Sequence, residues 1–171
     1  MAKTKIIMSW SKCKIEVGKT GDDDAMATEL TSIGVINDKS TTLASADGET
    51  LTAKATGGIV VAEEEGEPEI TLTTRVKEMS FEIEKLFTGA TVSEDESELT
   101  VTTNVVGEDF SVKLTPKNIG AIGIKIRRAH VSFRPGSSEE EGSYVDLTFK
   151  VLACDDGELY KKFKVAASDW E

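Results

Sequence analysis

The chain has 171 residues, a length typical of one domain whose core is large enough to need no metal or disulfide. Its 31 acidic residues outnumber its 20 basic residues, so the formal net charge is -11. That balance opposes binding to nucleic acid or to an anionic membrane, because phosphate contacts need clustered Lys and Arg.

The start of the chain predicts its cellular location. The first 17 residues hold no long apolar run and no small-residue cleavage site, so we interpret them as an uncleaved start that runs into a strand. No segment has the length of a membrane span. We therefore expect a cytoplasmic protein without membrane contact. Cys13 and Cys154 are then expected to be reduced core residues, with a bridge between them as the alternative.

The first part of the chain predicts one strand and then a long polar arm. Residues 12–21 have the pattern of a strand that ends in a turn. Residues 19–58 are rich in Thr, Ser, Asp and Gly, so we expect a loop or hairpin arm that contains short strands. Loops longer than about 12–15 residues are uncommon in compact domains and usually have a function. Residues 57–76 predict two strands joined by an acidic turn, with Pro68 at the entry to the second.

The segment SFEIEKLFTG predicts one short helix over about residues 80–88. Its apolar side chains recur at helical spacing and share one face: Ile83, Leu86 and Phe87. Ser80 is placed to cap the amino end, and Glu82 and Glu84 lie where the helix dipole favours negative charge. Gly89 is free to adopt the left-handed conformation just past the last turn.

After the helix the sequence alternates as strands do. Residues 98–106 and 110–116 predict two strands joined by a Gly-Glu-Asp turn. Residues 119–133 predict a third strand, whose inward face changes phase near Arg127 and Arg128, and this change indicates a β-bulge. The expected inward side chains are Ile122, Ile124 and Ile126 before the bulge and Val131 and Phe133 after it.

The last part of the chain predicts one more strand and a hairpin. Residues 134–143 have the composition of a polar loop, and residues 144–151 alternate regularly. Their expected inward side chains are Val145, Leu147, Phe149 and Val151. Asp156 and Gly157 form a strong two-residue hairpin signal.

Together these segments predict a mainly β fold. Eight to ten short strands with regular turn signals are typical of an antiparallel β-sandwich or barrel, here as one domain over residues 1–171 with one short flanking α-helix and the arm. A sandwich or barrel has open ends where the core would meet water. We expect the apolar face of the helix to close one of those ends.

No set of catalytic or ligand residues can be assembled from the sequence. His130 is the one histidine, and we interpret it as a surface or half-buried strand residue, since a zinc site would need more ligands at suitable spacing. The chain has no nucleophile elbow, phosphate loop or dinucleotide fingerprint. We therefore predict no catalytic, cofactor-binding or metal-binding residues, no cofactor and no enzymatic activity.

The charged clusters have simpler interpretations. Residues 22–24 and 155–157 lack the full pattern of a calcium loop, so they predict a solvated loop tip and a turn. Three acidic runs lie in different predicted loops, and they favour solubility, with a deliberately negative surface as the alternative: residues 62–69, 93–98 and 138–143. Residues 125–128 form the one basic cluster, available to pair with acids of a neighbouring strand or subunit. Without interleaved aromatic residues this cluster is a weak nucleic-acid site.

The order of these pieces resembles that of bacteriophage and prophage major tail tube proteins. The likeness rests on ELTSIGVINDKSTTLASADGETLTAKATGG (residues 29–58), on EPEITLTTRVKEMSFEIEKLFTG (residues 67–89) and on the series of hairpins that follows. In that family a strand leads into a long arm, then a sheet strand, one short helix on the flank of a β-sandwich, and more strands. The type VI secretion tube protein shares the fold.

The resemblance implies a structural subunit that self-assembles into stacked hexameric rings, which form a hollow tube for DNA passage. Its partners would be further copies of itself and other tail proteins, with no specific nucleic-acid binding and no membrane. The protein would be found in the cytoplasm of a bacterial host and then in the virion tail. The acidic balance fits this function, because a negative lumen repels DNA phosphates.

The alternative is a non-catalytic β-sandwich recognition module, such as an adhesin or a carbohydrate-binding domain. The absent signal peptide and the 6% aromatic content oppose it, since sugar platforms need exposed Trp or Tyr. Trp10 and Trp170 lie near the chain ends rather than in a predicted loop cluster.

Overall fold

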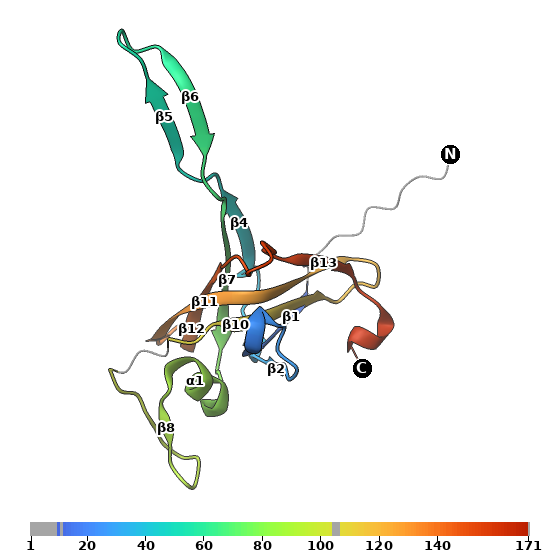
Figure 1. The fold of residues 1–171 in the computed structure, drawn as a ribbon. Helices are drawn as coiled ribbons and strands as arrows, with labels where there is room; N and C mark the ends of the chain where they lie inside the picture. Colours follow the sequence, from blue (N-terminus) through green and yellow to red (C-terminus); the bar gives the residue numbers. More distant parts are fainter. Residues whose placement is uncertain (1–9, 11, 104–106, 171) are drawn as a thin grey trace.

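The computed structural model of the chain describes residue 10, residues 12–103 and residues 107–170 (Figure 1). These residues form a mainly β fold with one α-helix, which confirms the predicted fold class. The main sheet holds nine strands: β1 (Cys13–Lys19), β2 (Thr31–Ser32), β3 (Val35–Ile36), β4 (Thr42–Ala46), β7 (Glu69–Lys77), β10 (Phe110–Pro116), β11 (Ile122–Ser138), β12 (Gly142–Val151) and β13 (Lys161–Lys164).

The remaining elements are short and lie around this sheet. Two hairpins are formed by β5 (Thr50–Lys54) with β6 (Val60–Glu65), and by β8 (Thr91–Val92) with β9 (Leu99–Thr100). The helix is α1 (Phe81–Thr88), and short 3-10 helices are η1 (Asp22–Asp24) and η2 (Ala167–Trp170). In the part of the chain that the structure describes there are thus thirteen strands, more than the eight to ten predicted, because four strands have only two residues.

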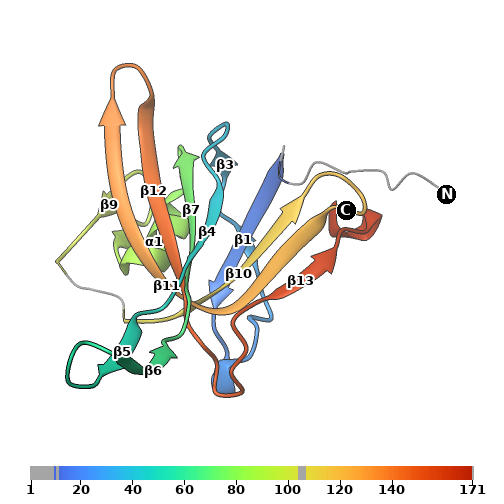
Figure 2. The ribbon, with the colours of Figure 1, turned by 90° about the horizontal axis from the view of Figure 1, so that it is seen from above.

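The sheet has two halves that share the strand β11. The first part of β11 pairs with β10 and β13, and the second part pairs with β12, which continues to β7. All these pairings are antiparallel, as expected. Figure 2 shows the two halves diverging from β11, with β12 on one side and β10 and β13 on the other. The sheet is therefore curled rather than flat.

Residues 31–36 connect the two ends of the curled sheet. β2 pairs with the outer edge of β1, and two residues later β3 pairs with β7. Between them the Ile33 amide donates to the Ile15 carbonyl oxygen at 3.0 Å, and the Ile33 side chain is fully buried. This short segment therefore joins the β1 edge to the β7 edge and gives the sheet a barrel-like closure.

The predicted bulge lies where β11 passes from one half to the other. Phe110 of β10 faces Ala129, whereas Val112 faces Ile126, so β11 has one more residue than its partner across Arg127 and Arg128. Before the bulge Ile124 and Ile126 are buried as predicted, but Ile122 is 44% exposed because it lies at the start of the strand. After the bulge the side chains of Val131 and Phe133 are half-buried.

The core occupies the concave side of the sheet. All four side chains predicted to point inward from β12 are buried: Val145, Leu147, Phe149 and Val151. They pack with apolar residues of β1, β7 and β10 in one continuous cluster. At about 25 cal/mol per Å² of buried apolar area, this cluster is the main source of folding free energy.

Helix α1 closes the aromatic end of that core, in agreement with its predicted bounds and caps. The Ser80 hydroxyl accepts from the Ile83 amide at 3.5 Å, and Gly89 is left-handed with φ 67. Phe87 is buried against three rings, with centroid distances of 5.2 Å to Phe110, 6.2 Å to Phe133 and 6.3 Å to Phe149. Ile83 is also buried, but Leu86 is only half-buried, so the apolar face is narrower than predicted.

Three sequence predictions after the helix are wrong in part. Only Leu99 and Thr100 of the predicted strand 98–106 form a strand, and its residues 104–106 lie outside the described residues. The predicted polar loop 134–143 is instead mostly strand, because β11 runs to Ser138 and pairs with β12 up to a turn of three glutamates. The turn at Asp156 and Gly157 is present, but β13 then pairs with β11 and not with β12.

The aromatic packing predicts a clear order of mutational effects in α1. Phe87→Ala should lower the free energy of unfolding by about 3–5 kcal/mol, because it leaves a cavity among three rings. Leu86→Ala, on the half-buried side of the same turn, is the matched control and should cost clearly less. Chemical denaturation followed by circular dichroism measures both values. Equal losses for the two variants would contradict the assignment of Phe87 as the residue that closes the core.

Candidate interaction surface

The most exposed part of the chain is a long hairpin arm, residues 47–68. β5 and β6 pair with each other and with no other strand of the described chain, and they continue the β4–β7 pair away from the sheet (Figure 1). Every residue from 49 to 69 is exposed. An isolated two-stranded hairpin is only marginally stable in water, so this arm lacks the packing that holds the rest of the fold.

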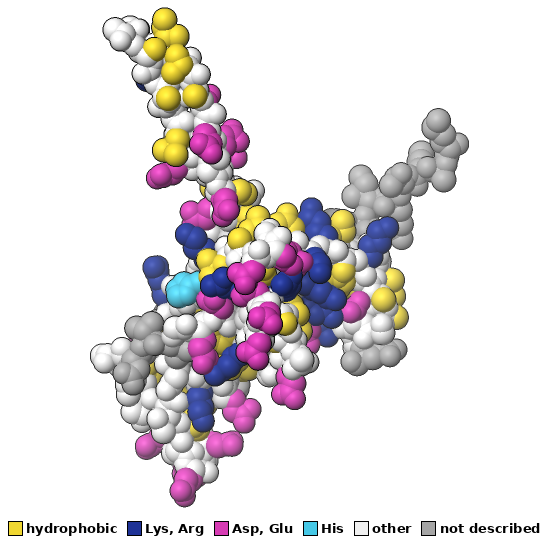
Figure 3. All heavy atoms as spheres, viewed as in Figure 1, with side chains coloured by type: hydrophobic (Ala, Val, Ile, Leu, Met, Phe, Trp, Pro, Cys, Tyr) yellow, Lys and Arg dark blue, Asp and Glu magenta, His cyan; other side chains and the backbone are white. Residues whose placement is uncertain are grey.

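Apolar and acidic side chains are distributed unevenly along the arm. Near the tip, three consecutive apolar side chains are more than half exposed: Ile59 at 65%, Val60 at 52% and Val61 at 63%. The stem then carries Glu63, Glu64 and Glu65 on β6, and Figure 3 shows acidic side chains along this part. The arm thus presents apolar side chains near its tip and a stem that is mainly negative, in which Leu51, opposite Glu64, is the one large apolar side chain and is 68% exposed.

Glycines shape both ends of the arm. At the tip Gly57 and Gly58 have φ values of 89 and 79, which L side chains rarely adopt. At the neck Gly48 lies so close to the Gly66 backbone that an added Cβ would be 2.3 Å from it. The Gly66 amide also donates to the Glu49 carbonyl oxygen at 2.9 Å. The neck is therefore a narrow strand crossing in which no side chain separates the two backbones.

The projecting arm is shifted along the sequence from the predicted range of 19–58. Residues 19–30 do not project, because they cover the outer face of β10: the Ala27 amide donates to the Ser111 hydroxyl at 2.9 Å, and the Thr20 hydroxyl donates to the Arg127 carbonyl oxygen. Residues 59–68, predicted only as a strand and turn, form the returning side of the arm. The sequence did not predict this returning side as part of the arm, because residues 59–61 have the apolar composition of a core strand.

The basic side chains of the cluster 125–128 are half-buried, and both arginines are bound to acidic residues. Arg127 donates to Asp156 at 2.8 Å, to Glu158 at 3.2 Å and to the Asp24 carbonyl oxygen at 2.8 Å. Arg128 donates to Asp109 at 2.6 Å. The two arginines of the bulge therefore hold the neighbouring loops in place. The cluster was predicted to pair with acidic residues, and these contacts agree with that prediction.

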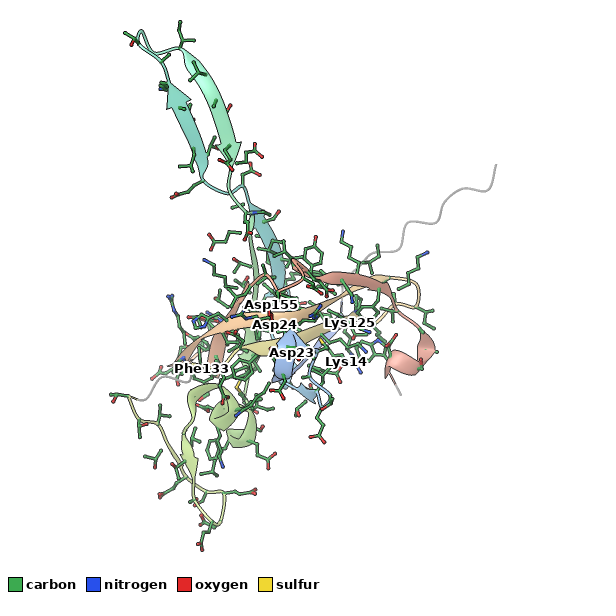
Figure 4. All side chains as sticks on the ribbon, in the orientation of Figure 1. Lys14, Asp23, Asp24, Lys125, Phe133 and Asp155 are labelled. Carbon is green, nitrogen blue, oxygen red and sulfur yellow. The ribbon has the colours of Figure 1, made fainter. Side chains whose placement is uncertain are left out.

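The predicted loop tip at residues 22–24 takes part in the same network. Asp22 and Asp23 are exposed as expected, whereas Asp24 is half-buried and its carboxylate accepts from the Asp155 amide at 3.0 Å (Figure 4). No group of three or more His, Cys, Asp or Glu side chains in the described part of the chain is arranged to hold a metal ion.

His130 and the two cysteines lie apart from one another. His130 is exposed on β11, opposite Lys150 of β12. Cys13 is half-buried on β1 and Cys154 is buried after β12, and both are free thiols, so the alternative of a bridge is not realised in this structure. Burial raises the pKa of both thiols, which lowers their reactivity.

An open cleft brings together the two tryptophans that the sequence places near opposite ends of the chain. Trp10 and Trp170 both line it, beside residues 34–41. Each indole N–H already has a partner, the Ile122 carbonyl oxygen for Trp10 and the Pro116 carbonyl oxygen for Trp170. Lys14 lies 5.0 Å from the centre of the Trp170 ring. The two rings are half-buried packing residues and do not form an open aromatic platform.

A charged cluster fixes the far end of the β11–β12 hairpin. Arg75 donates to both carboxylate oxygens of Asp146, at 2.7 and 3.0 Å, and to Glu141 at 2.7 Å. Its guanidinium also lies 4.0 Å from the centre of the Tyr144 ring. The hydrogen bond from Arg75 lowers the pKa of Asp146 below its ordinary value of 3.8.

These ion pairs predict the pH dependence of stability. The pKa of Asp156 is lowered by its hydrogen bond from Arg127, as that of Asp146 is by Arg75. Both groups add stability that is present above the ordinary pKa of 3.8 and is lost as the pH falls through the lower pKa of the folded state. The melting temperature should therefore fall below about pH 4, and less steeply in Asp146→Asn. Melting curves between pH 2 and 7 test this, and an unchanged slope in the variant would contradict it.

No helix in the described part of the chain is both long and apolar enough to cross a membrane. No family model matches the sequence, and no curated protein matches it.

Proposed function

We propose that the chain is a structural subunit that assembles with copies of itself through its hairpin arm. The observation that carries this proposal is the arm itself, in which 21 consecutive residues, 49–69, are exposed and three neighbouring apolar residues near the tip are more than half exposed. Because side chains alternate along a strand, both faces of the arm near its tip expose apolar groups, and apolar side chains grouped in this way mark a candidate interaction site. A partner that covered it would supply the packing that the solitary arm lacks.

The proposed assembly is a stack of hexameric rings that forms the hollow tail tube of a phage or prophage. This step rests on the resemblance to tail tube proteins, and the order of elements supports it: β4 leads into the arm, β7 returns from it, and one short helix follows on the flank of the sheet. The protein would then be made in a bacterial cytoplasm and end in the virion tail, with other tail proteins as further partners.

The absence of enzymatic activity is part of the same proposal. Cys154 lies beside Arg127 and Arg128, but it is buried, its thiol pKa is raised by that burial, and both arginines are bound to carboxylates. Among the described residues that line the cleft beside Trp10 and Trp170, no nucleophile is hydrogen-bonded to a base, an arrangement that covalent catalysis uses.

The direct test is to remove the arm without disturbing the sheet. Ala46 and Glu69 face each other in the β4–β7 pair, so a two-residue Asn-Gly turn can replace residues 47–68. We expect the shortened protein to melt cooperatively near the wild-type temperature, because the arm contributes no buried side chain. At high concentration the wild-type protein should form rings or tubes, and the shortened protein should stay monomeric.

Sedimentation velocity and negative-stain microscopy measure the assembly, and circular dichroism measures the fold. Assembly by the shortened protein at the wild-type concentration would refute the role of the arm. A wild-type protein that stays monomeric at every concentration would refute self-assembly altogether.

A tube for DNA passage should not hold the DNA. We predict that the protein does not retain duplex DNA at physiological salt, because its net charge is -11 and both bulge arginines are already paired with acids. A gel-shift assay with labelled duplex at micromolar protein measures this. Retention that weakens as salt is added would contradict the prediction and would indicate a phosphate-binding surface.

A further inference from the structure

The body of the protein carries a surface that matches the arm in both charge and apolar character. We define this lysine surface by five exposed side chains on the β10–β11 turn, the start of β11 and the edge strand β13: Lys117, Ile119, Ile122, Lys162 and Lys164. Ile119 is 67% exposed and Ile122 is 44% exposed. Ile122 lies directly opposite Lys164 in the β11–β13 pair, so the two side chains share one face.

The charges of the lysine surface have no ion-pair partner among the described residues. None of the ion pairs formed by the described residues involves Lys117, Lys162 or Lys164. The only strand that β13 pairs with is β11, so in the described chain its other edge is also open. Figure 3 shows basic side chains gathered on this part of the body.

The arm presents the opposite pattern. Residues 47–68 contain six acidic residues and one lysine, and none of Glu63, Glu64 and Glu65 takes part in an ion pair within the described chain. Its apolar residues 59–61 follow directly on the tip. In Figures 1 and 2 the arm and β13 extend in different directions from the body, so they do not meet within one molecule.

We infer that the lysine surface is the acceptor for the arm of a second copy of this chain. The acidic stem of that arm would lie over Lys117, Lys162 and Lys164, and its apolar residues would cover Ile119 and Ile122. Docking would neutralise two sets of unpaired charges and bury two exposed apolar clusters together. The arm and its acceptor are different surfaces, so the contact is heterologous and allows each copy to bind one neighbour through its arm and another through its acceptor. This inference rests on the proposed self-assembly and names its contact.

A charge exchange tests the contact. The arm variant Glu63→Lys/Glu64→Lys/Glu65→Lys and the acceptor variant Lys117→Glu/Lys162→Glu/Lys164→Glu should each raise the concentration needed for assembly by about tenfold or more, since like charges then face each other. The chain that carries both sets of changes should assemble again near the wild-type concentration, because the attraction is restored with the signs exchanged.

Two further measurements make the test specific. The control Glu94→Lys/Glu96→Lys/Glu98→Lys makes the same change in net charge as the arm variant, but in the exposed β8–β9 turn, and should leave assembly unchanged. Assembly of the wild type should weaken as salt rises, because the pairing charges are solvent-exposed before docking. Circular dichroism melting confirms that each variant is folded, as expected for substitutions of exposed side chains.

The possible outcomes separate this inference from the proposed function. If the wild type assembles and the shortened protein does not, but the acceptor variant assembles like the wild type, then the arm docks elsewhere and this inference is wrong. Failure of the doubly changed chain to recover also refutes the direct pairing of arm and lysine surface. If the wild type does not assemble at any concentration, both proposals fail.

Discussion

The bend in β11 at Arg127 and Arg128 is the constraint on which the rest of the fold depends. The extra residue at this bulge turns a 17-residue strand so that its first part belongs to one half of the sheet and its second part to the other. The core fills the space between the halves, and α1 closes the aromatic end. The same two arginines bind the acidic loops outside the bend, so curvature and surface charge are set at one place.

The sequence predicted the elements whose pattern is local. The helix was found because its cap residue, its apolar spacing and its terminal glycine agree, and β12 was found because it alternates without interruption. The bulge was visible as a change of phase along one strand. The sequence could not show that residues 31–36 join the two sheet edges, because two-residue strands carry no periodic signal. That closure depends on pairings between residues far apart in the chain.

The arm shows why the candidate site was only partly predictable. Its polar outgoing strand was correctly interpreted as an extension, but Ile59, Val60 and Val61 on the returning strand have the composition of a core strand, and only the structure shows that they face solvent. The lysine surface was not predicted. Lys162 and Lys164 belong to a basic run, residues 161–164, that is visible in the sequence, but only the fold places this run beside Ile119 and Ile122, about 40 positions earlier, through the β11–β13 pair and the hydrogen bonds of Val165. Whether a lysine forms an ion pair depends on which side chains the fold places beside it, and the composition of the chain does not reveal this.

The continuity of the arm with β7 determines how the molecule would respond to a pull. β7 runs without a break from the neck of the arm through the body, hydrogen-bonded to β12 along seven residue pairs and to β4 along five. Hydrogen bonds between strands lie perpendicular to the strand axis. A force applied along the arm would therefore load these bonds in shear, all at once, whereas a sideways force would bend the arm at its glycine neck. The arm would therefore resist a force along its axis and bend easily under a force across it.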